Sequence, residues 1–493
     1  MGAHHSHEMK GAAEGGSGSS TPRGSQRGGS GSRSGSGGDL QGLDQQDKPP
    51  PSMVPVEKLG KLLVQKSQKE DGINGVTEKS FTKYLFPLYP ELAHHFFSYI
   101  HRAGKCKNKY IPVGTFRTHC ERIMSILDDT LIIETYVKMF CTSEEGTVSP
   151  ECLKKLLYTS YKISMDHYPE GPQTCLMINK TLSSVISGCF HKKESHSVGF
   201  VVRWLQDNCH RLIFPVHRYC VHSIATRHRS IELESPSSEG SGLELGTPVL
   251  ERAVGAGSAL LPLSRAWLLA AAAEPLYSRP LQPPQPANGA GGGLASTAWL
   301  ARLVCAVPSH WVPLYSTGEH GRAANRFLHH TLAYRGPTIL LLQAGDVVLC
   351  VLVPCEWRES HAYWGGPGAG ALQLEPELEH LEAEGKVIYL NTHIRGYPKG
   401  LRVGIDPRSP VININEDFDK VTYRGSTYSI SSIEVWGCGD QRSRETQLEI
   451  KKWQVKEAER QRNVKLSAAE WMEHPDRYLL ELAGRPQYNN SAS

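Results

Sequence analysis

The C-terminal half of the chain contains a long apolar segment, Pro337-Thr338-Ile339-Leu340-Leu341-Leu342-Gln343-Ala344-Gly345-Asp346-Val347-Val348-Leu349-Cys350-Val351-Leu352-Val353. Two apolar runs flank Ala344-Gly345-Asp346, a short segment in which glycine can take the backbone angles of a turn. Apolar runs of this length around a turn are typical of a β-hairpin. The segment therefore predicts two buried, adjacent strands.

Further short strands are expected on the C-terminal side of this hairpin. The candidates are 386–390, 401–405, 411–415 and 433–436, which are separated by Gly- and Pro-containing turns. Helical patterns at 260–273 and 322–334 flank them. Short strands with a few helices predict a packed-sheet core.

The region before the sheet is predicted to be helical, because apolar residues recur every three or four positions from about Val54 to Ile231. Within it, the twelve residues from Cys141 to Cys152 have the shape of an EF-hand loop, with Gly146 at the turn. Calcium binding needs a carboxylate at the first position and a bidentate Glu at the twelfth, and both are cysteine here. We expect EF-hand-like helices that serve as a scaffold without metal.

Composition excludes several classes of function. The 493 residues have a net charge of +4 and no basic block, which argues against nucleic-acid binding. The 12 cysteines are spaced singly, which indicates reduced, buried thiols. The set Cys209, His210, His217, Cys220 and His222 matches no common zinc spacing. The most apolar window, 257–276, is interrupted by charged residues and does not predict a membrane span.

The first residues, Met-Gly-Ala-His-His-Ser, fit the N-myristoylation pattern, with Gly2 as the acceptor. Chance or an expression tag is the alternative. The Gly- and Ser-rich segment that follows, to residue 52, suits a disordered tether between a lipid and a folded body. One myristoyl chain binds membranes only marginally, so a partner or a folded surface has to supply a second anchor.

Several motifs between 314 and 437 resemble the TLDc domain family. They are Leu314-Tyr315-Ser316, His320-Gly321, Phe327, Gly336-Pro337-Thr338, Trp357, Gly400-Leu401-Arg402-Val403-Gly404, Asn413-Ile414-Asn415-Glu416-Asp417-Phe418 and Glu434-Val435-Trp436-Gly437. Their order and spacing carry the resemblance. The chain departs from the family pattern at Asn413, at Asn415 and in the second strand, so a divergent member is expected.

The whole architecture is similar to a lysosomal, mTOR-associated branch of this family. That resemblance implies a protein on the cytoplasmic face of the lysosomal membrane and in the cytoplasm. It also implies binding to the vacuolar proton-pumping ATPase and a link to mTOR pathway components. It implies no catalytic residues and no cofactor. Ser316 and His320 could be drawn as a nucleophile and a base, but turn residues that bond backbone are the better interpretation.

The C-terminal tail is the candidate binding element. Thr446 to Asn463 is a charged helical segment, in which Trp453 is the best anchor for a partner groove; a solvated helix is the alternative. Ser467-Ala468-Ala469-Glu470 predicts the capping box of a second helix. The predicted partner-binding residues are Trp453, Lys456, Arg460, Tyr478, Leu479 and Leu482.

The sequence thus predicts an α+β protein with an all-α EF-hand-like region, a β-sandwich-type TLDc domain with flanking helices, and a C-terminal helical tail. The expected divisions are a lipid-tethered tail (1–52), the helical domain (53–231), a linker (232–247), the TLDc domain (248–440), C-terminal helices (441–485) and a disordered end (486–493). The expected function is that of a non-enzymatic adaptor for the vacuolar ATPase. The alternatives are an oxidation-resistance protein that acts through thiols and a calcium-responsive membrane adaptor.

Overall fold

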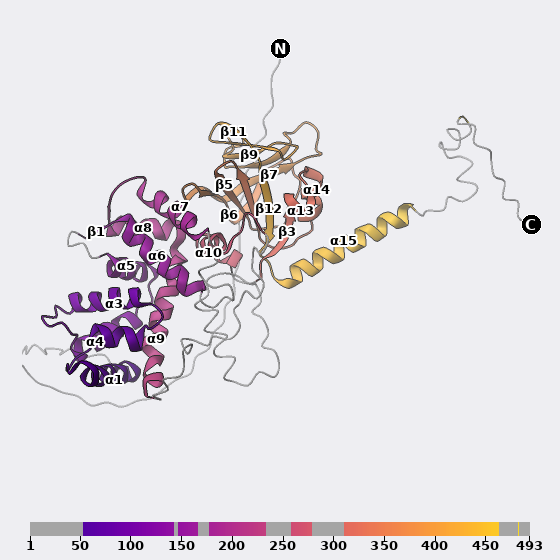
Figure 1. Cartoon of the computed structure of the whole chain (residues 1–493). Coiled ribbons are helices and arrows are strands. Elements are labelled where there is room, and N and C mark those ends of the chain that lie inside the picture. The colour runs from indigo at the N-terminus through magenta and orange to yellow at the C-terminus, as the bar shows by residue number, and fades with distance from the viewer. Residues whose placement is uncertain are drawn as a thin grey trace, which may run out of the picture. The chain divides into compact units, whose positions relative to one another are not determined.

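A computed structural model describes residues 53–141, 146–165, 177–232, 258–278, 310–462 and 482 (Figure 1). Gly2 and the tether, the linker after Glu232, and the capping box at 467–470 lie outside the described residues. Residues from Ser52 onward form one compact unit, and the fold below belongs to that unit.

The first part of the helical region is a pair of EF-hand-like helix-loop-helix units. Its elements are α1 (Val54–Asp71), α2 (Glu78–Ser80), η1 (Phe81–Leu85), α3 (Pro90–Ala103) and α4 (Val113–Met124). An antiparallel bridge between Val76 and Ile111 joins the two loops. The loop at Ile111 was not predicted as the partner of the loop that contains Val76.

The second part repeats this arrangement with α5 (Asp129–Phe140), β1 (Thr147–Val148), α6 (Pro150–Met165), α7 (Ile178–Phe190), β2 (His196–Ser197) and α8 (Val198–Cys209). Thr147 pairs with Ser197, and Val148 pairs with His196. The 3-10 turn η2 (His210–Leu212) and the long helix α9 (Phe214–Glu232) complete the region. The predicted all-α region is confirmed.

One antiparallel sheet forms the C-terminal part, with the strand order β11-β10-β9-β8-β7-β6-β5-β4-β12-β3. The strands are β3 (Val312–Ser316), β4 (Thr338–Ala344), β5 (Val347–Val353), β6 (Trp364–Glu375), β7 (Glu379–Asn391), β8 (Gly400–Val403), β9 (Ile412–Ile414), β10 (Lys420–Tyr423), β11 (Ser426–Ser429) and β12 (Ser432–Gly437). The predicted hairpin is β4–β5, in which Gly345 makes the turn with a φ of 61°.

Four strands were not predicted: β3, β6, β10 and β11. The long strand β6 was hidden because it contains Gly365, Gly366 and Gly368, and its pairing with β7 is irregular at each of these glycines. β7 is much longer than the predicted segment 386–390. Ile405 was assigned to a strand but lies beyond β8 and is exposed.

The two faces of the sheet pack against different neighbours. Side chains alternate along β4, so Ile339 and Leu341 join the core shared with the helices, while Leu340 and Leu342 face the interior of the β-sandwich. The helix α14 (Ala324–Thr331) contributes Phe327 to that interior. The predicted β-sandwich with flanking helices is confirmed.

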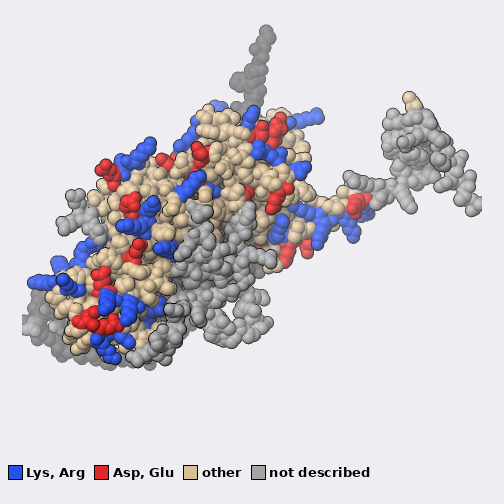
Figure 2. Space-filling view, in the orientation of Figure 1, with Lys and Arg blue, Asp and Glu red and all other residues tan. Residues whose placement is uncertain are grey.

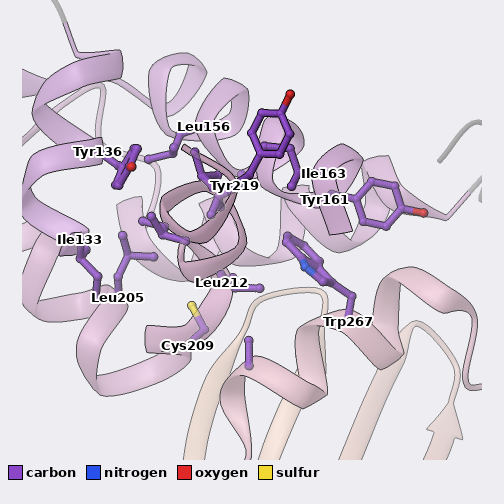
Figure 3. Close-up of a cluster of buried hydrophobic side chains, with 14 of the residues drawn as sticks. Ile133, Tyr136, Leu156, Tyr161, Ile163, Leu205, Cys209, Leu212, Tyr219 and Trp267 are labelled. Carbon is purple, nitrogen blue, oxygen red and sulfur yellow. The ribbon is translucent and has the colours of Figure 1, made fainter. Parts of the chain in front are cut away.

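A helix from the C-terminal half, α10 (Leu263–Ala272), enters the core of the helical region. Its Trp267 ring packs edge-on to Tyr161, with ring centroids 5.4 Å apart (Figure 3). Short α11 (Pro275–Ser278) follows, and its Tyr277 hydroxyl donates to the carbonyl of Gly368 in β6. The α10–α11 segment therefore joins the helical region to the sheet.

A buried ion cluster lies beside this junction. The Glu375 carboxylate in β6 accepts a hydrogen bond from Arg265 of α10 and forms an ion pair with Lys180 of α7, each at 2.6 Å. Glu375 and Arg265 are almost fully buried. In α7, the backbone carbonyl of Ser184 accepts from the Leu378 amide at 3.0 Å. Helix α7 is thus held to the sheet by polar bonds as well as by apolar packing.

Candidate partner-binding helix

The candidate site is α15 (Gln441–Arg462), which follows the last strand of the sheet. Asp440 caps it, because its carboxylate accepts from the Ser443 amide at 2.9 Å and from the Ser443 hydroxyl at 2.8 Å. The preceding Gly439 amide donates to the Tyr334 hydroxyl at 2.8 Å. The start of the helix is therefore fixed to the sheet domain.

A buried glutamine fixes the second turn. The Gln447 side chain is fully buried, and its amide nitrogen donates to the carbonyls of His330 and Leu332, both at 3.0 Å. These carbonyls lie at the C-terminal end of α14, where a helix leaves carbonyl groups without internal partners. Gln447 thereby joins the end of α14 to the base of α15.

Beyond Gln447 the helix presents large apolar side chains to solvent. Leu448 is 42%, Trp453 65% and Val455 58% exposed. A position advances about 100° per residue on a helix, so Trp453, Lys456 and Arg460 share one face. We call these three residues the Trp453 face. Lys456 and Arg460 are also exposed, and Arg460 has an ion pair with Glu457 at 3.7 Å.

A cluster of basic side chains lies at the base of the helix; its members are His320, His330, Arg444 and Lys451. The rings of His320 and His330 are 3.7 Å apart. Partial burial lowers the pKa of His330 to about 4, with further lowering by His320 and Lys451. Burial and the neighbouring Arg444 lower the pKa of Lys451 to about 8. At neutral pH, His330 is therefore neutral, and Arg444 and Lys451 supply the positive charge that would favour an anionic ligand group.

The two residues considered for catalysis, Ser316 and His320, accept hydrogen bonds from the backbone of the turn that contains them. His320 Nδ1 accepts the Ser316 amide at 3.1 Å, and Ser316 Oγ accepts the Gly318 amide at 3.3 Å. The His320 ring also stacks on Tyr315. This is the turn role that the sequence favoured for Ser316 and His320.

An oxidation-resistance function that acts through thiols needs a reactive cysteine, and the two cysteines nearest the sheet hairpin are protected. Cys350 is fully buried in the shared core, and burial raises its pKa well above the usual value. Cys355 is half-buried, and burial raises its pKa as well. A low-pKa, exposed thiol is the expected signature of a reactive cysteine, and neither residue has it.

The structure brings together three of the predicted partner-binding residues, namely Trp453, Lys456 and Arg460, on one face of α15. Leu482 is 88% exposed. Tyr478, Leu479 and the lipidation candidate Gly2 lie outside the described residues. The contact between His330 and α15 has no local sequence signal, because Lys451 and Gln447 are more than 100 positions away along the chain.

The residues that carried the resemblance act as internal supports. Trp357 donates from its indole nitrogen to the Thr338 hydroxyl at 2.8 Å. Glu434 accepts from Trp436 at 3.0 Å and from Ser258 at 2.6 Å. These polar groups bond one another inside the fold, so they help to hold the domain together.

The charges on the visible face are mixed, with Lys and Arg interspersed among Asp and Glu, including along α15 (Figure 2). Within the part of the chain that the structure describes, no three His, Cys, Asp or Glu side chains are grouped as a metal site requires. Among the described helices, none is both long and apolar enough to cross a bilayer.

Comparison with known proteins agrees with the motifs. Residues 293–439 match the TLDc domain family. No curated protein matches the chain. The match spans the region that contains strands β3 to β12, in which the motif residues form their internal bonds. The chain therefore carries a TLDc domain at residues 293–439, which supports its membership of the TLDc family.

Proposed function

We propose that this protein is a non-enzymatic adaptor that binds the vacuolar proton-pumping ATPase at the cytoplasmic face of the lysosomal membrane and links it to mTOR pathway components. A TLDc domain is consistent with this role, because proteins of the family are often linked to the vacuolar ATPase or to oxidation resistance. We favour the link to the vacuolar ATPase over oxidation resistance because of the resemblance in architecture and the geometry of α15.

The observation that carries the proposal is the combination of a fixed base and an exposed end in α15. Gln447 and Ser443 secure the first turns to the domain, while Trp453 keeps 65% of its surface exposed. A large aromatic side chain in water is a typical anchor for a partner pocket. A helix whose direction is already set by its base loses less conformational entropy on binding.

The charges around Trp453 indicate what the pocket should offer. Lys456 and Arg460 lie on the same face, and the cations Arg444 and Lys451 lie nearer the base. We therefore expect an apolar pocket for the indole ring, bordered by carboxylates of the partner. Such charge pairs at the rim would orient the helix, and burial of the indole ring would supply most of the affinity.

The membrane part of the proposal rests on Gly2. A single myristoyl chain gives reversible binding, so the protein needs a second contact to remain on a membrane. Binding to a membrane-embedded pump would supply it. Replacement of Gly2 by Ala should release the protein from lysosomal membranes while its affinity for detergent-solubilised pump stays unchanged.

The decisive experiment measures recovery of pump subunits with the tagged full-length chain from solubilised lysosomal membranes. Trp453→Ala is compared with Gln454→Ala, its exposed neighbour, and with a chain truncated after Asp440. Loss of a hot-spot aromatic weakens binding by about tenfold or more. We expect this loss for Trp453→Ala and for the truncation, and near-normal recovery for Gln454→Ala.

Two outcomes would contradict the proposal. Equal recovery from all variants would place the contact on the TLDc domain and remove the role of the Trp453 face. Absence of pump subunits from the intact chain would reject the adaptor function itself. Helical content measured by circular dichroism checks that Trp453→Ala keeps α15 folded.

A further inference from the structure

The loop between α3 and α4 carries three exposed lysines, Lys105, Lys107 and Lys109. We call residues 104–110 the lysine loop. The lysines alternate with other residues, so no continuous basic run marks the loop in the sequence. From residue 92 to residue 120 the chain contains neither Asp nor Glu. Because a calcium-binding EF-hand loop carries carboxylates, the charge of this EF-hand-like loop is reversed.

Hydrogen bonds fix the backbone of the lysine loop. The Cys106 amide donates to the carbonyl of His101 at 3.0 Å, and His101 Nε2 donates to the carbonyl of Asn108 at 2.6 Å. Just after the loop, Ile111 pairs with Val76 through two backbone bonds of 2.9 Å. The lysines are therefore presented from a fixed backbone, at the outer edge of the helical region (Figure 1).

The three loop lysines have no carboxylate partner. Within the described residues, none of them forms an ion pair. Acidic groups of neighbouring elements are already paired: Asp71 with Lys79 at 3.2 Å, and Glu78 with His94 at 2.5 Å. The paired loop at 72–76 contains no acidic residue. The lysine loop is thus a positive surface without compensation, which attracts anions.

We propose that the lysine loop contacts the anionic phospholipids of a membrane surface. Lysine suits such a partner, because its ammonium group is a mobile point charge that needs no bidentate geometry. Attraction of one lysine to an anionic leaflet corresponds to about a fivefold gain in partitioning. Three lysines together correspond to about a hundredfold gain, which salt screens.

The position of the loop in the chain allows it to act together with an acyl chain on Gly2. The Met53 amide donates to the Glu121 carboxylate at 3.0 Å, and Glu121 belongs to α4, the helix that follows the lysine loop. This helix is about 18 Å long. The roughly 50 residues between Gly2 and Met53 can reach up to about 160 Å. The acyl chain and the lysine loop can therefore touch the same bilayer.

This proposal deepens the membrane part of the proposed function, and it rests on that function only for the identity of the membrane. A single acyl chain binds marginally, so a second contact with the membrane is needed. The lysine loop adds a direct contact with lipid to the proposed contact with the pump. Its test needs neither the pump nor the acyl chain.

The test is co-sedimentation of the full-length, unacylated protein with vesicles, at lipid concentrations up to the millimolar range. Vesicles of phosphatidylcholine are compared with vesicles in which about a third of the lipid is phosphatidylserine. We expect at least about tenfold stronger partitioning into the anionic vesicles. This preference should decrease as salt rises from about 0.05 M to about 0.5 M, because the Debye length shortens.

Substitutions in the loop test whether these lysines carry the preference. The combined variant Lys105→Gln, Lys107→Gln and Lys109→Gln should partition into anionic vesicles at least about tenfold more weakly than the native chain. Replacement of the same three lysines by Arg keeps the charge and should keep the binding. Circular dichroism checks that both variants are folded.

The matched control removes the same charge from the sheet domain. It combines Lys386→Gln, Lys399→Gln and Lys420→Gln, three exposed lysines outside the helical region. We expect its partitioning to change less than about twofold, because charges more than a Debye length from the bilayer are screened. Equal losses in the control and in the loop variant would overturn the proposal, since net charge alone would then explain the binding.

Two other outcomes would also overturn it. One is equal partitioning of the native chain and the glutamine variant of the loop. The other is normal vesicle binding by that variant together with loss of pump subunits, because the loop would then contact protein and not lipid. Failure of the adaptor function gives a different result. A native chain that recovers no pump subunits, but loses anionic vesicles when the loop lysines are replaced, would still support the lipid contact.

Discussion

Replacement of Glu375 by Ala tests whether the buried ion cluster holds the helical region to the sheet. Glu375 forms ion pairs with Arg265 and Lys180, both at 2.6 Å. Without the carboxylate, the Arg265 side chain remains 4% exposed and has lost its counter-ion. Removal of one partner from a buried pair costs about 3–5 kcal/mol, because the remaining charge is uncompensated. Lys180 is 53% exposed and can turn to water, so it adds little.

The matched control is Glu379→Ala. Glu379 forms an ion pair with Arg424 in which the two side chains are 45% and 55% exposed, and such surface pairs contribute about 0–1 kcal/mol. Urea unfolding followed by circular dichroism gives the free energy of unfolding for each variant. We expect a loss of at least about 3 kcal/mol for Glu375→Ala and at most about 1 kcal/mol for Glu379→Ala. Equal losses would refute the reasoning.

The same cluster gives a prediction about pH. Burial opposes ionisation of Glu375, but hydrogen bonds from Lys180 and Arg265 outweigh it, so the pKa of Glu375 in the folded protein lies below the usual value. A lowered pKa stabilises the fold above the unfolded-state value of about 4.3, and this stabilisation is lost as the pH falls through the folded-state value. The difference between the native chain and Glu375→Ala should therefore be constant near neutrality and decrease below about pH 4.

Two other predictions concern the packing of α7 and the charge at the base of α15. Gly188→Ala would place a methyl group 2.3 Å from the carbonyl oxygen of Leu378, and we expect a destabilisation of about 1–3 kcal/mol. Gly199→Ala, whose added methyl group meets no atom within 4 Å, should be neutral or slightly stabilising when both variants are measured by urea unfolding. An acidic partner would raise the pKa of Lys451 from about 8, so binding should take up protons and weaken as the pH rises from about 7 to 9. Lys451→Arg keeps its charge and should flatten this pH dependence of pump recovery, whereas an unchanged profile would contradict an anionic contact there.

The sequence was most informative where local pattern and tertiary burial agree. The hairpin β4–β5 was predictable because both strands are buried on both faces and a glycine turn separates them. Strand β6 was not, because its glycines contribute no apolar side chains and its register shifts repeatedly against β7. The EF-hand-like loops at Ile111 and His196 were missed for a similar reason, since each is identified only by its bridge to a distant loop.

The candidate site likewise has one part that could be predicted from the sequence and one part that could not. Trp453, Lys456 and Arg460 are spaced so that they share one face of a helix, and this spacing is visible in the sequence alone. The cluster of His320, His330 and Lys451 depends on the packing of α15 against α14, and this in turn depends on the hydrogen bonds of Gln447. Long-range polar contacts of this kind have no local sequence signal.

The motif residues support the fold, so the residues that select a partner should be sought outside them. Trp357 bonds Thr338, and Glu434 accepts three hydrogen bonds, from Trp436, from Ser258 and from a backbone amide. Substitution at such positions leaves buried polar groups without partners, so the fold itself is weakened. A loss of pump binding in these variants would therefore report on stability. Trp453 is exposed and lies six residues beyond the buried Gln447, so its replacement tests the proposed binding without this ambiguity.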